Sequence, residues 1–401
     1  MEDPFASGQL RIEADDIDAP GLPPEFASGE FLPGMLPRRA DIEAKQEQIT
    51  RVLEALGVEA ALLLVPSHVS WFTNGMNHRG LMADSERPGV YTNGKQRWLL
   101  CSNVDTLRLF DEELDQLGFQ LKEWTWEGGR AELLMNITTG RKVASDRPFP
   151  NMPQISERLR PLLRVLSPYE QDAYRELGKI VAHAVEATAR NFSRGQSEEE
   201  VAGQLGHRML HRGVEATAIS VTADGRGEKF RRAGFTSTPI QHSCVIQATG
   251  QKDGLFATAS RTVSFGPPSD NLRSAFEMAV KLSAVYRSMT KPEESMGTVN
   301  AAGQLLLTQT PFEYDWRLSQ PGYGTGRFPA EELRRAAFDE RFTAGQALVW
   351  QPRVGAAAVV DTVIVTEDGP DIITPPDGWP FKRVAVQGRS YDIPDVLVKD
   401  D

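Results

Sequence analysis

The sequence lacks the features that mark several large classes of protein. It has 2 cysteines, Cys101 and Cys244, in 401 residues, which is too few for a disulfide framework and fits a reducing compartment. No apolar run approaches the roughly 18–20 residues that a membrane-spanning helix needs. The acidic N-terminus shows no cationic start followed by an apolar stretch, so we expect no signal peptide. We therefore predict a cytoplasmic protein that does not enter a membrane.

The chain also has fewer positively than negatively charged residues. The chain has 44 Lys and Arg against 55 Asp and Glu, a formal net charge of −11. Such a surface repels a phosphate backbone, so we expect no nucleic-acid partner. At 40% hydrophobic residues the chain can bury a core, and its length predicts two or three domains of roughly 100–200 residues each.

Histidine is scarce and unevenly placed, since none of the 6 histidines lies after His242. No Walker loop, nucleophile elbow, His-Glu-x-x-His or Cys-x-x-Cys motif is present. His207 and His211 are four residues apart on a predicted helix and could share a metal ion. No third ligand is evident beside them, so we interpret them as solvated surface residues.

The first 166 residues read as an arm and a small domain. Residues 1–38 are proline-rich without periodicity, and we predict an extended N-terminal arm. Residues 39–166 alternate helical and strand-like segments, which predicts an α/β domain. The expected elements are a helix from Asp41 to Gly57, strands at Ala60–Val65 and Trp98–Cys101, and a second helix at Asp105–Leu117.

Residues 167–401 are predicted to form an α+β domain. Ser167 and Ser197 each precede a glutamate by three residues, at Glu170 and Glu200, and both pairs are typical of a capping box at a helix start. A third amphipathic helix is expected at 270–286. The strand-like runs between and after these helices are Ser243–Ala248, Ala257–Phe265, Ala347–Gln351 and Ala358–Thr366.

Two segments have a composition suited to binding. The adjacent Arg231 and Arg232 suit bidentate recognition of a carboxylate or phosphate, although surface salt bridges would also explain them. Pro321–Arg327 is the densest glycine cluster, and such glycines form either a tight structural loop or a loop that lines a pocket.

The order of these segments resembles the pita-bread family, which includes methionine aminopeptidase, prolidase and creatinase. Gly254–Val263 looks like the family's Gly-Tyr-x-x-Asp-x-Thr-Arg-Thr strand, and Pro321–Pro329 looks like its Gly-His-Gly-x-Gly loop. Gly345–Pro352 looks like its Gly-Met-x-x-x-x-Glu-Pro strand, and Gly355–Thr374 looks like its closing Glu-Asp-Thr-Val-x-Val-Thr hairpin. Four motifs in the right order are specific for the fold.

The N-terminal half carries a second resemblance. From Arg39 to Asn74-Gly75 it is similar to the N-terminal domain of creatinase and prolidase. The resemblance therefore implies a C-terminal pita-bread domain at 167–401, preceded by a smaller α/β creatinase-type domain at 39–166. It also implies a homodimer, the common state of these relatives.

The resemblance fails at the family's chemistry. Its peptidases hold two divalent metals with two Asp, one His and two Glu, which ionise a bridging water near neutral pH. Carried over residue by residue, these ligands fall on Gln247, Thr258, Tyr323, Gln351 and Val360. None of these is a strong ligand for a hard metal, and Asp361 fits better as the non-ligand acid beside the lost Glu. We therefore expect no metal and no cofactor.

Creatinase implies a metal-free alternative that rests on a histidine in the loop before the first of these strands. That place falls near Phe230 or Arg231, and the nearest histidine is His242, twelve residues later. The catalytic candidates are therefore Tyr323, whose pKa flanking arginines would have to lower, and His242, which could equally be structural.

Our leading hypothesis is a metal-independent protein that binds, and either transforms or only holds, a small carboxylate-bearing molecule or peptide in the former metallopeptidase cleft. The candidate binding residues are Arg231, Arg232, Gln247, Thr258, Arg327, Gln351 and Arg353. One alternative is an inactive pseudopeptidase that serves as an interaction module, similar to the peptide- and histone-binding domain of a chromatin chaperone. The other is a true metallopeptidase, should the ligand register be wrong. A deep arginine-lined pocket favours the first hypothesis, and a filled pocket with an exposed apolar patch favours the second.

Overall fold

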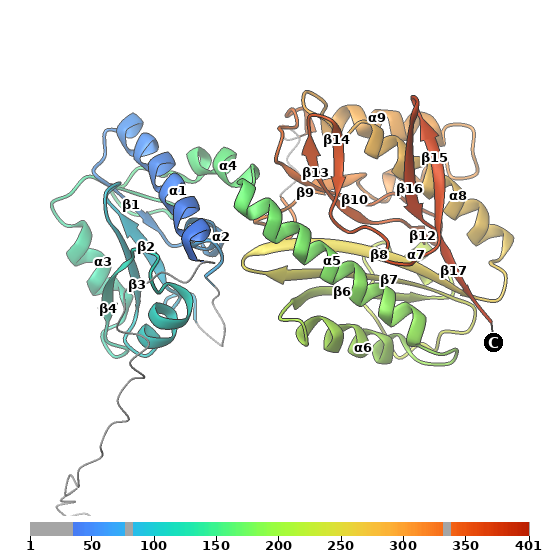
Figure 1. Ribbon diagram of the computed structural model, residues 1–401, viewed down its shortest axis with the longest axis horizontal. Helices are drawn as coiled ribbons and strands as arrows, with labels where there is room; N and C mark the ends of the chain where they lie inside the picture. Colours follow the sequence, from blue (N-terminus) through green and yellow to red (C-terminus); the bar gives the residue numbers. More distant parts are fainter. Residues whose placement is uncertain (1–34, 77–82, 332–337, 401) are drawn as a thin grey trace, which may run out of the picture.

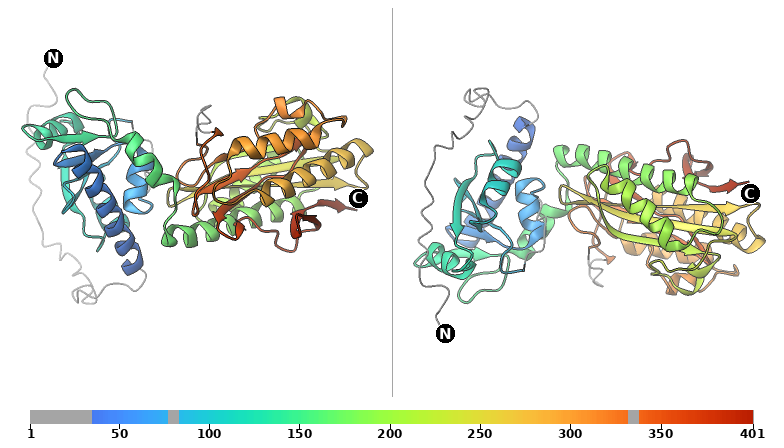
Figure 2. Two further views of the ribbon diagram at one scale, coloured as in Figure 1. Left: turned by 90° about the horizontal axis from the view of Figure 1, so that it is seen from above. Right: turned by 90° about the horizontal axis from the view of Figure 1, so that it is seen from below.

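A computed structural model of the chain describes residues 35–76, 83–331 and 338–400. It shows two unequal bodies joined at α4 (Ser156–Arg164) and α5 (Pro168–Asn191), with α5 running from the junction along the larger body (Figure 1). Views along the perpendicular direction show the same two bodies with a narrow waist between them (Figure 2). No helix in the described ranges is both long and apolar enough to cross a membrane.

The N-terminal body is one mixed sheet with helices packed on it. Its strand order is β4-β3-β2-β1-β5, with β1–β5 and β3–β4 parallel and the remaining pairs antiparallel. The strands are β1 (Ala60–Leu63), β2 (Gly89–Thr92), β3 (Arg97–Ser102), β4 (Gln120–Trp124) and β5 (Val143–Ser145). The other helices are α1 (Met35–Leu56), α2 (Pro66–Thr73) and α3 (Arg130–Thr138).

Two predictions for this half need correction. The arm predicted for 1–38 lies outside the described residues as far as 34, and residues 35–38 already belong to α1. The helix predicted at Asp105–Leu117 is present but shorter, over residues 106–113, and it is wound as a π-helix from Arg108 to Glu113. Leu109 and Leu114 are both buried, and their spacing of five residues suits the wider winding of a π-helix better than an α-helix.

The C-terminal body consists of two sheets between helices. The larger has the order β17-β8-β7-β6 and the smaller β14-β13-β10-β9. Helices α5 and α6 (Glu198–Leu210) pack on the first sheet, and α8 (Asp270–Ser288) and α9 (Met296–Leu307) lie beside the second (Figure 1). The strands of the two sheets are β6 (Glu215–Ala223), β7 (Ser243–Lys252), β8 (Leu255–Phe265), β9 (Gly322–Gly324), β10 (Ala347–Trp350), β13 (Asp361–Thr366), β14 (Gly369–Ile372) and β17 (Val396–Lys399).

The smaller elements of the C-terminal body pack mainly on α8. The hairpin β15 (Phe381–Val386) and β16 (Arg389–Pro394) packs on α8, as do the short paired strands β11 (Arg353–Val354) and β12 (Ala357–Ala358). The turn-like helices are α7 (Arg226–Lys229) and a 3₁₀ turn at Asp315–Arg317. Together with the predominantly antiparallel pairing, this confirms the predicted α+β class.

Local signals in this half predicted its elements well. Both capping boxes form, with the Ser167 and Ser197 hydroxyls accepting from the Glu170 and Glu200 backbone N–H groups at 3.2 Å. Each glutamate in turn accepts from the serine backbone N–H, so two otherwise unpaired donors are satisfied at each helix start. Helix α9 was not predicted, because its sequence is apolar without a clear amphipathic period.

Candidate functional site

The five positions expected to match metal ligands come together between the two C-terminal sheets. Gln247 lies on β7, Thr258 on β8 and Tyr323 on β9, while Gln351 follows β10 and Val360 precedes β13. The Tyr323 hydroxyl bonds to Thr258, and Gln247 and Gln351 line one pocket. The five residues selected from the sequence motifs therefore lie in one region of the fold.

The side chains in this region do not fit a pair of divalent cations. Tyr323 and Val360 belong to a buried apolar cluster whose other members are Val245, Val349 and Ala358. Among the described residues no three His, Cys, Asp or Glu side chains are placed to hold one metal ion. Asp361, next to Val360, is held by Arg287 at 2.7 Å and Arg261 at 3.3 Å. Its carboxylate is thus already neutralised by two buried guanidinium groups.

A pocket of about 220 Å³ remains beside the apolar cluster. Three arginines line it, Arg231, Arg232 and Arg353, together with the amides of Gln247 and Gln351. Sequence reasoning missed the other polar groups of its wall, which are Ser220, Ser319 and Gln320. No motif marked them, because they come from β6 and from an irregular segment before β9.

Arg353 is a partly buried cation of the arginine pocket. It donates a hydrogen bond to Gln247 Oε1, and no ion pair links it to an acid of the described residues. Burial, followed by repulsion from Arg231, lowers the pKa of Arg353. Both causes mean that the charged guanidinium is less favourable here than in water.

Arg231 is only partly compensated. Its Nη1 donates to the Gly355 carbonyl at 2.6 Å and its Nη2 to Asp315 Oδ2 at 3.1 Å, whereas its buried Nε has no partner in the described structure. Arg232 is exposed at the wall. The pocket therefore carries three guanidinium groups against the single carboxylate of Asp315.

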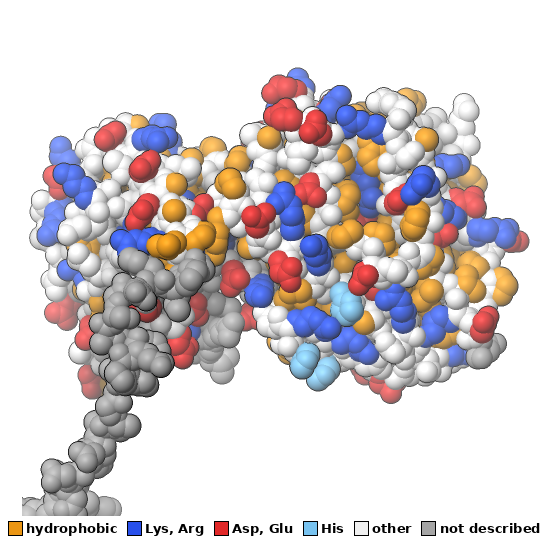
Figure 3. Space-filling model, in the orientation of Figure 1, with side chains coloured by type: hydrophobic (Ala, Val, Ile, Leu, Met, Phe, Trp, Pro, Cys, Tyr) orange, Lys and Arg blue, Asp and Glu red, His pale blue; other side chains and the backbone are white. Residues whose placement is uncertain are grey.

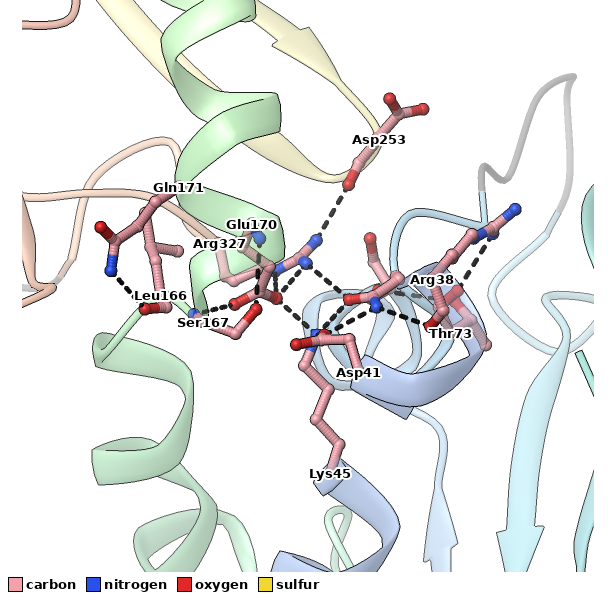
Figure 4. A network of polar contacts seen from close by, with 12 residues as sticks. Arg38, Asp41, Lys45, Thr73, Leu166, Ser167, Glu170, Gln171, Asp253 and Arg327 are labelled. Atoms are coloured by element: carbon pink, nitrogen blue, oxygen red, sulfur yellow. Dashed lines mark hydrogen bonds and ion pairs between the residues drawn. The ribbon is translucent and has the colours of Figure 1, made fainter. Parts of the chain in front are cut away.

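Arg327, which the sequence suggested as a binding residue, does not line the arginine pocket. Figure 4 shows it in a buried network between the two domains, where its Nε donates to Glu170 Oε1 at 3.0 Å. Lys45 of α1 reaches the same oxygen at 2.6 Å, and Arg327 Nη1 donates to the Asp253 carbonyl at 2.9 Å. Burial alone would raise the pKa of Glu170, but Arg327 and Lys45 outweigh it and lower that pKa to about 2.

Tyr323 does not have the lowered pKa that catalysis would need. Its side chain is 8% exposed, and burial raises its pKa despite the hydrogen bond to Thr258 and the charge of Arg353. Loss of hydration of the phenolate outweighs the attraction of Arg353, so this condition for catalysis by Tyr323 is not met. Tyr323 is not among the residues that line the arginine pocket.

His242 lies at the entrance of β7, in a different depression. Its backbone N–H donates to Asp224 Oδ1 at 2.7 Å, and its exposed side chain lines a groove of about 790 Å³ with Glu228 and Lys229. This groove shares only Arg231 and Leu318 with the arginine pocket. A catalytic role for either Tyr323 or His242 stays a prediction.

The histidines of α6 and its C-cap are exposed, as expected. The rings of His207 and His211 stack at 6.1 Å between centroids, 19° from parallel. Histidine side chains are visible on the surface of the C-terminal body over α5 and α6 (Figure 3).

Two sheets enclosed by paired helices, with motif-bearing strands meeting between them, define the C-terminal body as a pita-bread domain. Residues 172–367 match the model of metallopeptidase family M24. Over these residues the chain thus matches the pita-bread family that its motifs predicted.

Relatives of the whole chain have the same two-part organisation. It is 20% identical over 344 residues to the Xaa-Pro dipeptidase of Pyrococcus furiosus, covering 83% of this chain and 98% of that protein. The crystal structure of the prolidase from Pyrococcus horikoshii superimposes with a TM-score of 0.70 at 16% identity, covering 83% and 99% of the two chains. The N-terminal domain of the FACT complex subunit SPT16 from chickpea gives 0.60 at 11% identity, covering 85% and 96%. At these identities the structural matches show the fold alone.

Proposed function

We propose that this protein binds a small carboxylate-bearing molecule in the arginine pocket without a metal ion. The observation that carries the proposal is Arg353, a guanidinium largely removed from water with no carboxylate partner in the described structure. A buried cation without a counter-charge is costly, and proteins normally pair it or neutralise it. A ligand carboxylate would supply that missing charge.

The surrounding groups suit the same ligand. The unpartnered Nε of Arg231 and the exposed guanidinium of Arg232 add donors of the kind that hold a carboxylate bidentately. Gln247, Gln351 and Gln320 offer neutral amides for the rest of the molecule. The volume of about 220 Å³ favours a ligand no larger than a dipeptide.

We further propose that the family's metal ligands are replaced in this chain and that the pocket binds rather than hydrolyses. Gln, Thr, Tyr, Gln and Val at the five positions offer no ionised donor. Tyr323, whose pKa is raised, is protonated at neutral pH and a poor base.

Titration calorimetry with acetate, succinate and the dipeptide Gly-Pro tests the binding proposal. We expect at least one of them to bind saturably, and Arg353→Met to weaken it at least tenfold, because a hydrogen bond to a charged group is worth about 1.5–3 kcal/mol. Arg273→Met is the matched control, since Arg273 is 60% exposed on α8 and pairs only with its neighbour Asp270. No binding of any probe, or equal loss in both variants, would overturn the proposal.

Elemental analysis tests the metal-free part. Protein purified without chelators or an affinity tag, and then incubated with manganese, zinc or cobalt, should retain no tightly bound ion after gel filtration. One to two equivalents per chain, together with hydrolysis of Gly-Pro, would restore the metallopeptidase hypothesis.

A second candidate function is favoured by apolar side chains at the pocket. Phe230 is 55% exposed beside Arg231, and Leu318 is 57% exposed on the pocket wall. Such a rim suits a longer peptide whose C-terminal carboxylate enters the pocket. A peptide with a free C-terminus should then bind at least tenfold more tightly than its amidated form.

Light scattering on the same protein samples would test the expected homodimer.

A further inference from the structure

We propose that a cavity between the two domains is a second binding site, for an apolar molecule with one anionic group. The cavity has a volume of about 480 Å³ and is lined by residues of both bodies. It shares no lining residue with the arginine pocket. The proposal therefore does not depend on the function argued for that pocket.

Most of the wall is apolar. The apolar lining includes Val65 and Pro66 at the start of α2, Phe256 of β8 and Phe328 of the glycine-rich segment. Covering such a surface with an apolar ligand gains roughly 25 cal/mol per Å² removed from water. Concave, mostly apolar cavities at domain boundaries are the usual setting of small-molecule sites.

Three polar features of the N-terminal domain point to a negative charge on the ligand. The first is Ser70 of α2, whose buried Oγ has no hydrogen-bond partner in the described structure while its side chain lines the cavity. The residue is 7% exposed. Leaving a buried hydroxyl unpaired is unfavourable, so a ligand acceptor at this wall would be stabilised.

The second feature is Arg87, which lies just before β2. It is partly buried on the cavity wall, and its guanidinium makes no ion pair or hydrogen bond among the described residues. Of the two acids near it in sequence, Asp84 is already engaged by Arg147 and Glu86 accepts from the Ala83 backbone N–H at 3.2 Å. A half-buried, unpaired guanidinium is a site for a carboxylate or phosphate.

The third feature is the N-terminus of α2 itself. Pro66 occupies its first position and no side-chain cap hydrogen bond forms. The buried Asp146 carboxylate accepts from the Val65 N–H at 2.9 Å and offsets part of the positive end of the helix dipole. On the opposite wall, the carboxylate of Glu215 accepts from the Gln251 amide at 3.1 Å when that amide is oriented to satisfy both its atoms. The anionic group is thus expected on the α2 and Arg87 side and the apolar body between Phe256 and Phe328.

The two proposed sites occupy different stretches of the same strands. Thr217 and Gln251 line the interdomain cavity, whereas Ser220 and Gln247 line the arginine pocket. Four residues along β7 correspond to about 13 Å at roughly 3.3 Å per residue. A small ligand in one site therefore leaves the other free.

Titration calorimetry with octanoate, and with 1-octanol as its uncharged match, tests the proposal. We expect octanoate to bind at least tenfold more tightly than 1-octanol. With the arginine pocket first disabled by Arg353→Met, Arg87→Gln should remove this difference, whereas the surface control Arg51→Gln, at a side chain 74% exposed, should leave octanoate affinity unchanged. Equal affinity for both probes, no saturable binding, or loss of octanoate binding in Arg353→Met but not in Arg87→Gln would overturn it.

Ser70→Ala provides a second, independent test. Removing an unpaired buried hydroxyl should raise the melting temperature of the free protein by about 2 °C while weakening octanoate binding several-fold. A lower melting temperature with unchanged octanoate affinity would show that the hydroxyl serves the fold rather than a ligand, and would overturn its assignment to the site.

Discussion

Buried positive charge is handled in opposite ways in two regions of this molecule. Between the domains, Lys45 and Arg327 converge on Glu170, and the three side chains are nearly inaccessible to water. In the arginine pocket, Arg353 has no acidic partner in the described structure and Arg231 has one, Asp315. The first arrangement is complete in itself, and the second is complete only with an anion from outside.

This difference separates structural arginines from ligand-binding ones. Arg327 and Arg353 both looked like binding residues in the sequence, since each lies in or beside a motif of the former active site. What distinguishes them is the counter-charge that the fold brings to each. A compensated guanidinium fixes two segments together, whereas an uncompensated one is a binding group.

Removing the charge of Glu170, on which Lys45 and Arg327 converge, should have the largest effect on the free energy of unfolding. Among the described residues, Glu170→Gln leaves Arg327 buried without a carboxylate partner and Lys45 with Asp41 alone, at 2.8 Å, and we expect the free energy of unfolding to fall by about 3–5 kcal/mol. Urea unfolding monitored by circular dichroism measures it.

Asp172→Asn on the same helix is the control. Its carboxylate is 80% exposed and pairs with Arg175, so the change should cost less than about 1 kcal/mol. Similar losses in the two variants would show that burial does not distinguish them and would break the comparison.

The pH dependence of stability sharpens the same contrast. The pKa of Glu170 is lowered to about 2 from its usual value of 4.5. A carboxyl group with a lowered pKa in the folded state contributes stability that is full above pH 4.5 and is lost as the pH falls toward 2. Between pH 5 and 3 the wild type should therefore lose more free energy of unfolding than Glu170→Gln. Parallel curves for the two proteins would contradict the assignment.

Removing the uncompensated charge of Arg353 should change the free energy of unfolding by less than Glu170→Gln does, and in the opposite direction. Arg353→Met relieves a buried cation without a partner but strands Gln247, so we expect the free protein to be unchanged or stabilised by up to about 1 kcal/mol. Calorimetric melting without ligand measures this. A loss of 3 kcal/mol or more, as large as that expected for Glu170→Gln, would mean that Arg353 is structural.

A change of free energy no larger than about 1 kcal/mol, with no change of affinity, is expected at Tyr323. Tyr323→Phe removes the hydrogen bond to Thr258 and should cost about 1 kcal/mol of stability. Affinity for the carboxylate probes should not change, because the side chain lies in the apolar cluster. A tenfold loss of affinity in this variant would place the hydroxyl in the binding site.

Local signals made most of the C-terminal fold predictable. The capping boxes at Ser167 and Ser197 fixed two helix starts, and β7, β8, β10 and β13 fell on short apolar runs. The helix predicted at Asp105–Leu117 formed only over residues 106–113, and most of it is wound as a π-helix.

The candidate site was predictable only in part. Motif positions brought Gln247, Gln351 and Arg353 to one pocket. Asp315 was missed because it meets Arg231 across 84 residues of sequence with no pattern connecting them. Glu170 was predicted as a cap, and its Oε2 does accept from the Ser167 N–H at 2.9 Å. Its second oxygen, which binds Lys45 and Arg327, gave no sign in the sequence.

By itself, the sequence predicted the pita-bread fold and the positions at which we propose that the family's metal ligands are replaced. These properties follow from patterns a few residues long, set by backbone hydrogen bonding and side-chain chemistry. The tertiary structure alone decided which arginines are neutralised and which are not, and that a cavity lies between the domains. Charge compensation depends on distances between segments far apart in the chain, and those distances are fixed only when the sheets and the two domains pack together.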